Sequence, residues 1–455
     1  MGEINKKPSK CRALVLEKGI LKKHPVYWEE KEITSVVAEK IKYLGKEYNH
    51  TLSDKQQIEE TVDKLKKGLK KINRTVIAQK CKCWILQNMM IPRIIWPLTI
   101  YAFPQSKIEQ MEKEITRFLK KWMGIPKSLS TDLLYARSSV LQLPFTSIVE
   151  EAKVAKARTK VMLETSGDDC INKANISLDS GRKWKVGEAV EDAKSRLRLQ
   201  DIAGIANVGK EGLGMNLRKY YAGSSDKEKK QLIVKKIRES EEESRLVRIA
   251  ALAKQSRTLD WGVQQRIVKG NSMFETPEAQ LQFAIKAVYD LLPTPENTNL
   301  WFRTDQYVCH LCGGKGTLPH ILAGCRIALA QGRYKWRHDR VLRELCIWIE
   351  EKRKAVNSTQ WKRTLIKFVK AGEKSKDSSH QQLPLLESIL KNARDWKMKA
   401  DLPESPLVVP AHIAATSQRP DIIITSEAIK QMYVIELTVP MEGRCEISTE
   451  LKTTK

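Results

Sequence analysis

Apolar residues recur at helical spacing between residues 51 and 124. One stripe comprises Ile58, Val62, Leu65, Leu69, Ile72 and Val76, and a second comprises Ile108, Met111, Ile115, Phe118 and Trp122. Positions three and four apart share one face of an α-helix, so each stripe predicts an amphipathic helix that buries this face. Ser53 and Ser106 each precede a Gln or Glu at capping-box spacing, which predicts that they begin the two helices.

The pattern is less regular on either side of these stripes. The runs CRALVL and KIKYLG within residues 1–50 favour strands that are too short to form a sheet alone, as at the edge of a domain. Residues 136–300 are predicted to be mostly helical, with a linker at 168–181 and a long exposed helix at 226–257. The segment TPEAQLQFAIKAVYDLLPTPENTNLW predicts an amphipathic helix that ends at a proline-rich turn.

The pattern changes again after Gln331. A basic helix is predicted over 333–352, a polar loop around 375–382, and two strands in the runs DIIIT and MYVIELTV. The chain is therefore predicted to be multidomain and mostly α-helical, with a C-terminal α/β region.

The net charge of the chain indicates which class of binding partner it favours. The 455 residues include 81 Lys and Arg against 54 Asp and Glu, a formal net charge of +27. Such an excess favours a polyanionic partner, because basic side chains near phosphates release counterions; an acidic membrane surface is the competing interpretation. The most apolar stretch, 89–103, is interrupted by prolines and too short to span a bilayer, and the N-terminus lacks a secretory signal. Nine thinly spread cysteines favour a reducing compartment.

A Cys/His cluster is the sharpest local motif. Its spacing is C-x2-C-x7-H-x4-C, formed by Cys309, Cys312, His320 and Cys325. Zinc takes four thiolate or imidazole ligands in a tetrahedron, and the intervening glycines let the backbone fold around the ion. We predict a structural Zn²⁺ site here, with His310 as a bystander; four unrelated residues in one loop are the alternative.

Basic residues lie near this cluster and along the first amphipathic helix. Those assigned to nucleic-acid contact are Lys67, Lys70, Lys71, Arg333, Lys335, Trp336, Arg337 and Arg340. Basic groups interleaved with aromatic rings suit phosphate contact and base stacking. The alternatives are a solvated helix face for the lysines and a charged helix with aromatic core anchors near the cluster.

Two carboxylates mark the C-terminal strands. Asp421 follows Arg-Pro and precedes DIIIT, and Glu436 lies within the second apolar run, where burying an unpaired acid is costly. Carboxylates on neighbouring strands can hold Mg²⁺, which activates water and stabilises the leaving oxygen of a phosphodiester. This is the PD-(D/E)xK arrangement of restriction-like nucleases, although Thr438 stands where the lysine is usual. Lys452 and Lys455 are the candidates for that lysine. A Pro-Asp pair and a strand Glu without any shared role are the alternative.

A second acidic motif, Gly167-Asp168-Asp169, is similar to a polymerase metal motif. It lacks the apolar flanking strands that such a motif needs, so we interpret it as a surface turn.

The order of these motifs resembles the C-terminal region of non-LTR retrotransposons with a restriction-like endonuclease. The resemblance rests on the zinc cluster, GRYKWRHDRVL, RPDIIIT and VIELTVP, and upstream on KPSKCRALVLEKG, KYLGKEY and LLPTPENTNLW. It covers most of the chain and is weakest over 140–275. It implies a DNA endonuclease that nicks its target so that a reverse transcriptase can extend the exposed end.

The resemblance also implies a domain organisation. It gives a reverse transcriptase palm remnant (1–50), a helical thumb (51–135), a helical linker (136–300), the zinc motif (301–332) and a truncated endonuclease (333–455). The polymerase aspartates are absent, so the chain is expected to be a gene fragment that does not polymerise and has weak or no nuclease activity. Asp421, Glu436 and Lys452 become catalytic, whereas the helix containing Arg337 and His338 has no assigned role.

The implied partners are DNA and retroelement RNA, with no membrane, and the implied location is the nucleus. The alternative is a non-catalytic, zinc-containing nucleic-acid-binding protein derived from a retroelement. Only the endonuclease hypothesis predicts Mg²⁺-dependent cleavage that is lost on Asp421→Ala.

Overall fold

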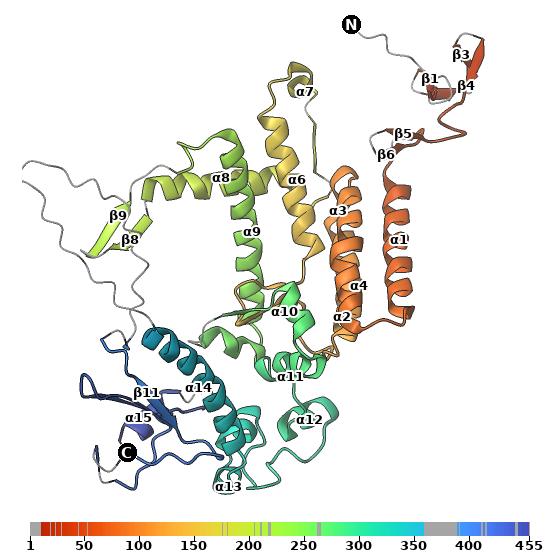
Figure 1. Cartoon of the computed structure of the whole chain (residues 1–455). Helices are drawn as coiled ribbons and strands as arrows, with labels where there is room; N and C mark the ends of the chain where they lie inside the picture. The colour runs from red at the N-terminus through yellow and green to blue at the C-terminus, as the bar shows by residue number, and fades with distance from the viewer. Residues whose placement is uncertain are drawn as a thin grey trace, which may run out of the picture. The chain divides into compact units, whose positions relative to one another are not determined.

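The computed structural model describes residues 11–454 except 19, 23, 29, 44, 52, 175, 180, 204, 210–211, 217–219, 262–264, 359–388, 391, 411–412, 415 and 442–444. The chain forms two compact units, Met1–Leu292 and Pro293–Lys455. Helices make up about 54% of the structure and the sheets are small (Figure 1). The prediction of a mostly helical multidomain protein is confirmed. None of the described helices combines the length and apolar character needed to cross a membrane.

The first unit begins with short β-hairpins. They are β1 (Val15–Glu17) with β2 (Ile20–Lys22), β3 (Val26–Trp28) with β4 (Lys31–Ile33), and β5 (Ile41–Tyr43) with β6 (Lys46–Tyr48). The strands predicted in CRALVL and KIKYLG overlap β1 and β5. Gly45 turns between β5 and β6 at φ +84°, where a Cβ would lie 3.0 Å from the Trp96 ring nitrogen. The backbone N–H of Glu47 donates to the Tyr101 hydroxyl (3.0 Å), which ties this hairpin to the helices.

Four helices and a π-helical turn form the N-terminal part of the first core, which later elements of the unit complete. They are α1 (Lys55–Arg74), α2 (Gln79–Ile85), η2 (Leu86–Met90), α3 (Ile91–Ile100) and α4 (Gln105–Trp122). Both predicted stripes are on the inner faces of α1 and α4, with Leu69 and Ile115 fully buried. Val76 is the exception, because α1 ends before it and the side chain is fully exposed.

Neither predicted capping box forms. The N-cap of α1 is Asp54, one residue after Ser53, and the N-cap of α4 is Pro104, so Ser106 lies inside the helix. The fixed φ of proline suits the start of a helix, and the carbonyl of Pro104 accepts from the N–H of Lys107 (2.9 Å). The proline therefore sets this helix start two residues earlier than the serine would.

A second core lies between α6 (Ile148–Glu164), α8 (Val186–Ala203) and α9 (Asp226–Ala250). The helix α9 was predicted to be exposed, and this is wrong. Ile233 and Ile237 are buried in this core, and Ile249, near the C-terminal end of the helix, is buried in the first core. The mixed charge of this segment made it resemble a solvated helix. In the fold, several of these charged side chains form ion pairs with other elements and lie beside a buried apolar face.

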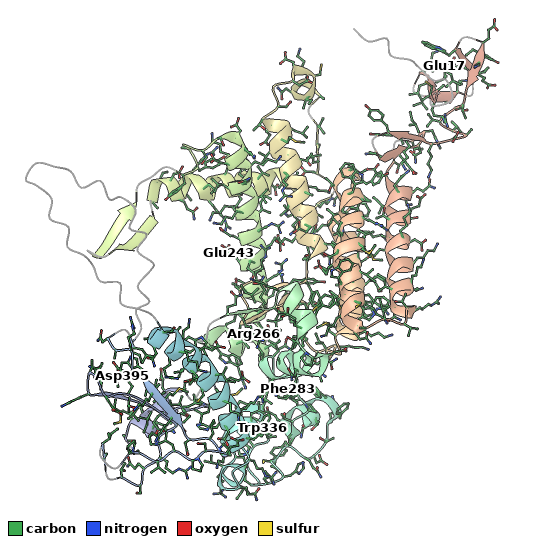
Figure 2. The ribbon with its side chains drawn as sticks, viewed as in Figure 1. Glu17, Glu243, Arg266, Phe283, Trp336 and Asp395 are labelled. Carbon is green, nitrogen blue, oxygen red and sulfur yellow. The ribbon has the colours of Figure 1, made fainter. Side chains whose placement is uncertain are left out.

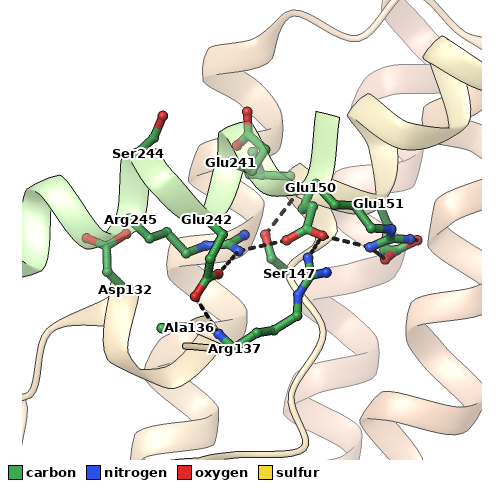
Figure 3. A network of polar contacts seen from close by, with 12 residues as sticks. Asp132, Ala136, Arg137, Ser147, Glu150, Glu151, Glu241, Glu242, Ser244 and Arg245 are labelled. Atoms are coloured by element: carbon green, nitrogen blue, oxygen red, sulfur yellow. Dashed lines mark hydrogen bonds and ion pairs between the residues drawn. The ribbon is translucent and has the colours of Figure 1, made fainter. Parts of the chain in front are cut away.

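Those pairs form the ionic network drawn in Figure 3. The carboxylate of Glu150 in α6, 5% exposed, contacts the guanidinium groups of Arg137, Arg238 (2.7 Å) and Arg245 (2.7 Å). Glu242 of α9 accepts from the backbone N–H of Arg137 (2.7 Å) and contacts Arg245 (3.2 Å). The network therefore joins α6, α9 and the segment after Tyr135, with the Glu150 carboxylate and the Arg245 guanidinium shielded from water.

Shorter elements complete the first unit. They are α5 (Thr131–Tyr135), β7 (Leu141–Gln142), α7 (Asp169–Lys173), β8 (Ile205–Gly209), β9 (Gly212–Asn216), η3 (Gln255–Asp260), β10 (Arg266–Ile267), α10 (Gly270–Glu275) and α11 (Glu278–Val288). Asp168 is the exposed N-cap of α7, so the Gly-Asp-Asp motif lies at the surface as predicted. The proline-rich turn after α11 also begins a helix, because Pro295 occupies the first turn of α12 (Pro295–Phe302).

The second unit places a helix against a small sheet. After α12 its elements are η4 (His320–Gly324), α13 (Arg326–Ala330), α14 (Lys335–Ser358), β11 (Lys397–Ala400), β12 (Ile422–Ser426), β13 (Gln431–Ile435) and α15 (Cys445–Thr453). The antiparallel sheet has the order β11-β12-β13. One face packs on α14 through Leu342 and Ile349, which join Trp396, Ile422 and Ile424 in one core. The predicted basic helix and both strands are present, and the predicted polar loop around 375–382 lies outside the described residues.

Candidate metal centres and nucleic-acid-facing surfaces

The four predicted zinc ligands come together in the second unit. The ligand atoms of Cys309, Cys312, His320 and Cys325 all lie within 4.8 Å of one another. The sulfurs of Cys309 and Cys325 are 4.0 Å apart, and the Cys312 sulfur is 3.1 Å from Nε2 of His320. Two sulfurs that share a tetrahedral zinc with bonds of about 2.3 Å lie about 3.8 Å apart. The cluster can therefore hold a metal ion such as zinc.

A tight turn presents the first two sulfurs. The N–H of Cys309 donates to Gly314 (2.6 Å), and the N–H of Gly313 returns a bond to the Cys309 carbonyl (2.9 Å). Gly313 adopts φ +70°, which a residue with a side chain rarely adopts. The backbone N–H of Leu311, helped by that of Cys312, lowers the pKa of the Cys309 thiol to about 6, although burial opposes this shift. The turn thus favours the thiolate that metal binding requires.

Helical turns supply the other two ligands. His320 begins η4, and Cys325 is the N-cap of α13. The Tyr334 hydroxyl accepts from the N–H of Cys325 (3.3 Å) and donates to the carbonyl of Ile321 (2.9 Å), which holds both turns together. His310 is exposed and contributes no atom to the cluster, in agreement with its prediction as a bystander.

Antiparallel pairing places the predicted carboxylates opposite each other. Ile422 of β12 pairs with Ile435 of β13, so Asp421 and Glu436 flank this pair at the same end of the two strands. The premise that Glu436 is buried within a strand is wrong. The strand ends at Ile435 and the Glu436 side chain is 40% exposed. The second apolar run is therefore only partly a strand, and its acid lies at an accessible sheet edge.

Lys452 of α15 bridges the two acids. Its ammonium lies 2.6 Å from Oε2 of Glu436 and 3.4 Å from Oδ2 of Asp421. The N–H of Leu437 also donates to that Oδ2 (2.6 Å). Partial burial alone would lower the pKa of Lys452, but the hydrogen bond and charge of Glu436, together with Asp421, raise it overall, so the ammonium is charged at neutral pH. The other candidate, Lys455, lies outside the described residues.

A hollow of about 500 Å³ opens beside this group. Its lining includes Arg419, Pro420, Glu436 and Lys452 above the apolar side chains of β12 and β13. Arg419 forms an ion pair with Asp401, which helps to hold the segment before β12. Glu436 and Lys452 are therefore reachable from solvent, whereas the Asp421 side chain is only 13% exposed.

One further polar residue reaches the acids. His338, in the first turn of α14, places Nε2 3.4 Å from Oδ1 of Asp421 and Nδ1 3.2 Å from Asp339. The sequence assigned no role to this histidine. The only local signal is the Arg-His-Asp tripeptide at a helix start, and nothing in that spacing shows that the helix packs against β12.

The basic residues predicted to face nucleic acid lie in both units, on α1 in the first and around the start of α14 in the second. Lys67, Lys70, Lys71 and Arg74 line an exposed hollow of about 390 Å³ at the C-terminal half of α1. Only one of these four has a described ion pair, between Lys67 and Asp63 (2.7 Å). Four cationic groups on one helix face make a surface suited to phosphates.

The start of α14 presents the other predicted contacts. Trp336, which is labelled in Figure 2, is 75% exposed, and Arg333, Lys335 and Arg340 are also exposed. Arg337 differs, because its guanidinium donates to the carbonyls of Leu322 (2.7 Å) and Val439 (3.1 Å). These bonds favour a structural role in which Arg337 links the zinc cluster to the segment after β13.

No protein-family model and no curated protein matches the chain. The interpretation of the sites therefore depends on their geometry and on the chemistry of their residues.

Proposed function

We propose that this chain carries the zinc, thumb and endonuclease regions of a non-LTR retrotransposon protein, that it binds nucleic acid, and that its C-terminal site is that of a metal-dependent endonuclease which nicks target DNA in the intact protein. The observation that carries the proposal is the convergence of Asp421, Glu436 and Lys452 from two antiparallel strands and a helix. These are the groups that a PD-(D/E)xK-like nuclease needs. The supporting observations are the zinc-type cluster and the exposed basic surfaces in the same chain.

The donor set fits Mg²⁺. This ion prefers oxygen ligands and is held by one or two carboxylates, with water completing its coordination. Asp421 and Glu436 provide two carboxylates, and the ammonium of Lys452 between them shows that the pair attracts a cation. A bound Mg²⁺ would supply Lewis-acid stabilisation of the phosphodiester and a more acidic water.

The protein residues prepare this site in three ways. The N–H of Leu437 and the ammonium of Lys452 both contact Oδ2 of Asp421, which fixes the orientation of its carboxylate. The exposed edge position of Glu436 leaves its side chain accessible to a phosphate. Lys452 carries a positive charge that can stabilise negative charge developing on the scissile phosphate.

The test is nicking of supercoiled plasmid by zinc-loaded protein with Mg²⁺. Asp421→Ala and Glu436→Gln should each lower the rate by at least about 100-fold, because several kcal/mol of transition-state stabilisation depend on the metal. The matched control is Glu446→Gln, an exposed carboxylate on α15 that should leave the rate unchanged. Salt-sensitive DNA binding without Mg²⁺-dependent nicking would refute the endonuclease and favour the non-catalytic binding protein.

A further inference from the structure

The guanidinium of Arg337 lies between two backbone segments of the second unit. Its Nη1 donates to the carbonyl of Leu322 (2.7 Å), and its Nη2 donates to the carbonyl of Val439 (3.1 Å). The guanidinium carbon is 5.4 Å from the centroid of the Tyr334 ring, and the Nε atom is buried. A shielded cation is costly unless it is paired, so these charge-assisted bonds hold the group in place. The rigid, planar guanidinium therefore fixes the spacing of the two segments.

The first of these segments carries two zinc ligands. Leu322 is inside η4, between His320 and Cys325. The Tyr334 hydroxyl holds the same stretch, because it donates to the carbonyl of Ile321 (2.9 Å) and accepts from the N–H of Cys325 (3.3 Å). Contacts that fix the backbone between two ligands keep both ligand atoms in position for the metal.

The second segment follows the acidic residues of the proposed nuclease site. Val439 comes two residues after Leu437, whose N–H donates to Oδ2 of Asp421 (2.6 Å). Because β13 ends before Glu436, the residues from Glu436 to Val439 lie outside the sheet ladder and depend on other contacts for their position. The start of α14 provides two such contacts, since His338 also lies 3.4 Å from Oδ1 of Asp421.

We propose that Arg337 is a positioning residue through which zinc binding helps to fix the carboxylates of Asp421 and Glu436. Zinc orders the segment around Leu322, and the guanidinium passes this order to Val439. The consequence for cleavage rests on the proposed function, whereas the coupling of the two segments does not. Such a coupling is reciprocal, so a change that releases Val439 from Arg337 should also weaken zinc binding.

The test compares two substitutions that share the zinc side of this contact. Arg337→Gln removes both guanidinium bonds, whereas Tyr334→Phe removes only the hydroxyl bonds near the zinc ligands and keeps the ring beside the guanidinium. Arg340→Gln is the control, because Arg340 is exposed and lies 3.6 Å from Glu344 of the same helix. Zinc affinity of the full-length protein is measured by competition with a chelator. Hydrogen exchange of the peptide 431–441 is measured at saturating zinc and after zinc removal.

We expect Arg337→Gln and Tyr334→Phe each to weaken zinc binding about 10-fold, as loss of a contact outside the ligand shell does. At saturating zinc, Arg337→Gln should speed exchange of the peptide 431–441 about 10-fold, to the rate that wild type shows without zinc. Tyr334→Phe should keep the slow wild-type exchange at saturating zinc, because its lost bonds do not involve Val439. Arg340→Gln should match wild type in both measurements.

Unchanged exchange of this peptide after zinc removal from wild type would overturn the coupling without reference to any variant. Wild-type zinc affinity in Arg337→Gln would also overturn it, as would faster exchange throughout β11 and β12 on zinc removal, since zinc would then hold the whole unit. Exchange in β11 and β12 equal to wild type identifies the variants that are folded.

Plasmid nicking separates this role from the proposed function. If wild type nicks DNA and Arg337→Gln nicks at the same rate, the positioning role is wrong. If wild type does not nick but zinc still slows exchange of the peptide 431–441 through Arg337, the endonuclease is refuted and the coupling stands.

Discussion

The ionic network between α6 and α9 makes a strong prediction about stability. Glu150 is the shared anion of three arginines, of which Arg245 is itself only 5% exposed. The substitution Glu150→Gln keeps the shape of the side chain and removes its charge. The guanidinium groups then lie close together without the carboxylate that neutralised them, so we expect α6 and α9 to separate more easily.

The expected loss of stability can be estimated from the burial of the ion pairs. Removing one partner of a buried ion pair costs about 3–5 kcal/mol. Arg245 keeps its contact with Glu242, and Arg137 and Arg238 are 40% and 25% exposed, so water screens part of the repulsion. We therefore expect a loss near the lower end, about 3 kcal/mol, which corresponds to a factor of roughly 100 in an opening equilibrium.

Hydrogen exchange of the full-length protein measures that equilibrium locally. Peptides from α6 and α9 should exchange roughly 100-fold faster in Glu150→Gln than in wild type. The control is Glu243→Gln on α9, because Glu243 and Arg196 form a pair in which both side chains are exposed (60% and 42%). This pair is worth about 0–1 kcal/mol, so exchange should change less than about fivefold. An equally small effect for Glu150→Gln would refute the argument from burial.

Three further predictions concern the metal cluster, pH and salt. Cys312→Ala should lose one bound zinc per chain by native mass spectrometry and His310→Ala should keep it, because only the former removes a clustered ligand. Burial raises the pKa of Glu112, so the stability that its protonated form contributes is present below the ordinary glutamate range and is lost as pH rises through the raised pKa. The melting temperature of Glu112→Gln relative to wild type should therefore increase from pH 4 to pH 8. A constant difference in melting temperature would contradict this argument. Substituting Lys70 and Lys71 together by Gln should reduce the slope of log affinity for DNA against log salt by about two, and an unchanged slope would exclude this face of α1 from the interface.

Much of the local structure was predictable because it depends on short-range spacing. The stripes of α1 and α4 follow the 3.6-residue period, and the zinc ligands follow turns only a few residues long. Where a local rule failed, another local preference was stronger, as at Pro104, which begins α4 in place of Ser106. The burial of α9 was not predictable in this way, because its partners on α6 and α8 are distant in the sequence.

The residue types of the C-terminal site can be read from the amino-acid sequence: an acid before an apolar strand, an acid after the next strand and a lysine beyond it. How these residues meet depends on the packing of separate elements. Antiparallel register puts Asp421 opposite Glu436, the position of α15 brings Lys452 into contact with both acids, and the packing of α14 against the sheet brings His338 to Asp421. The physical reason is that periodicity along the chain specifies the face on which a side chain lies, whereas the distance between two faces depends on how separate elements pack.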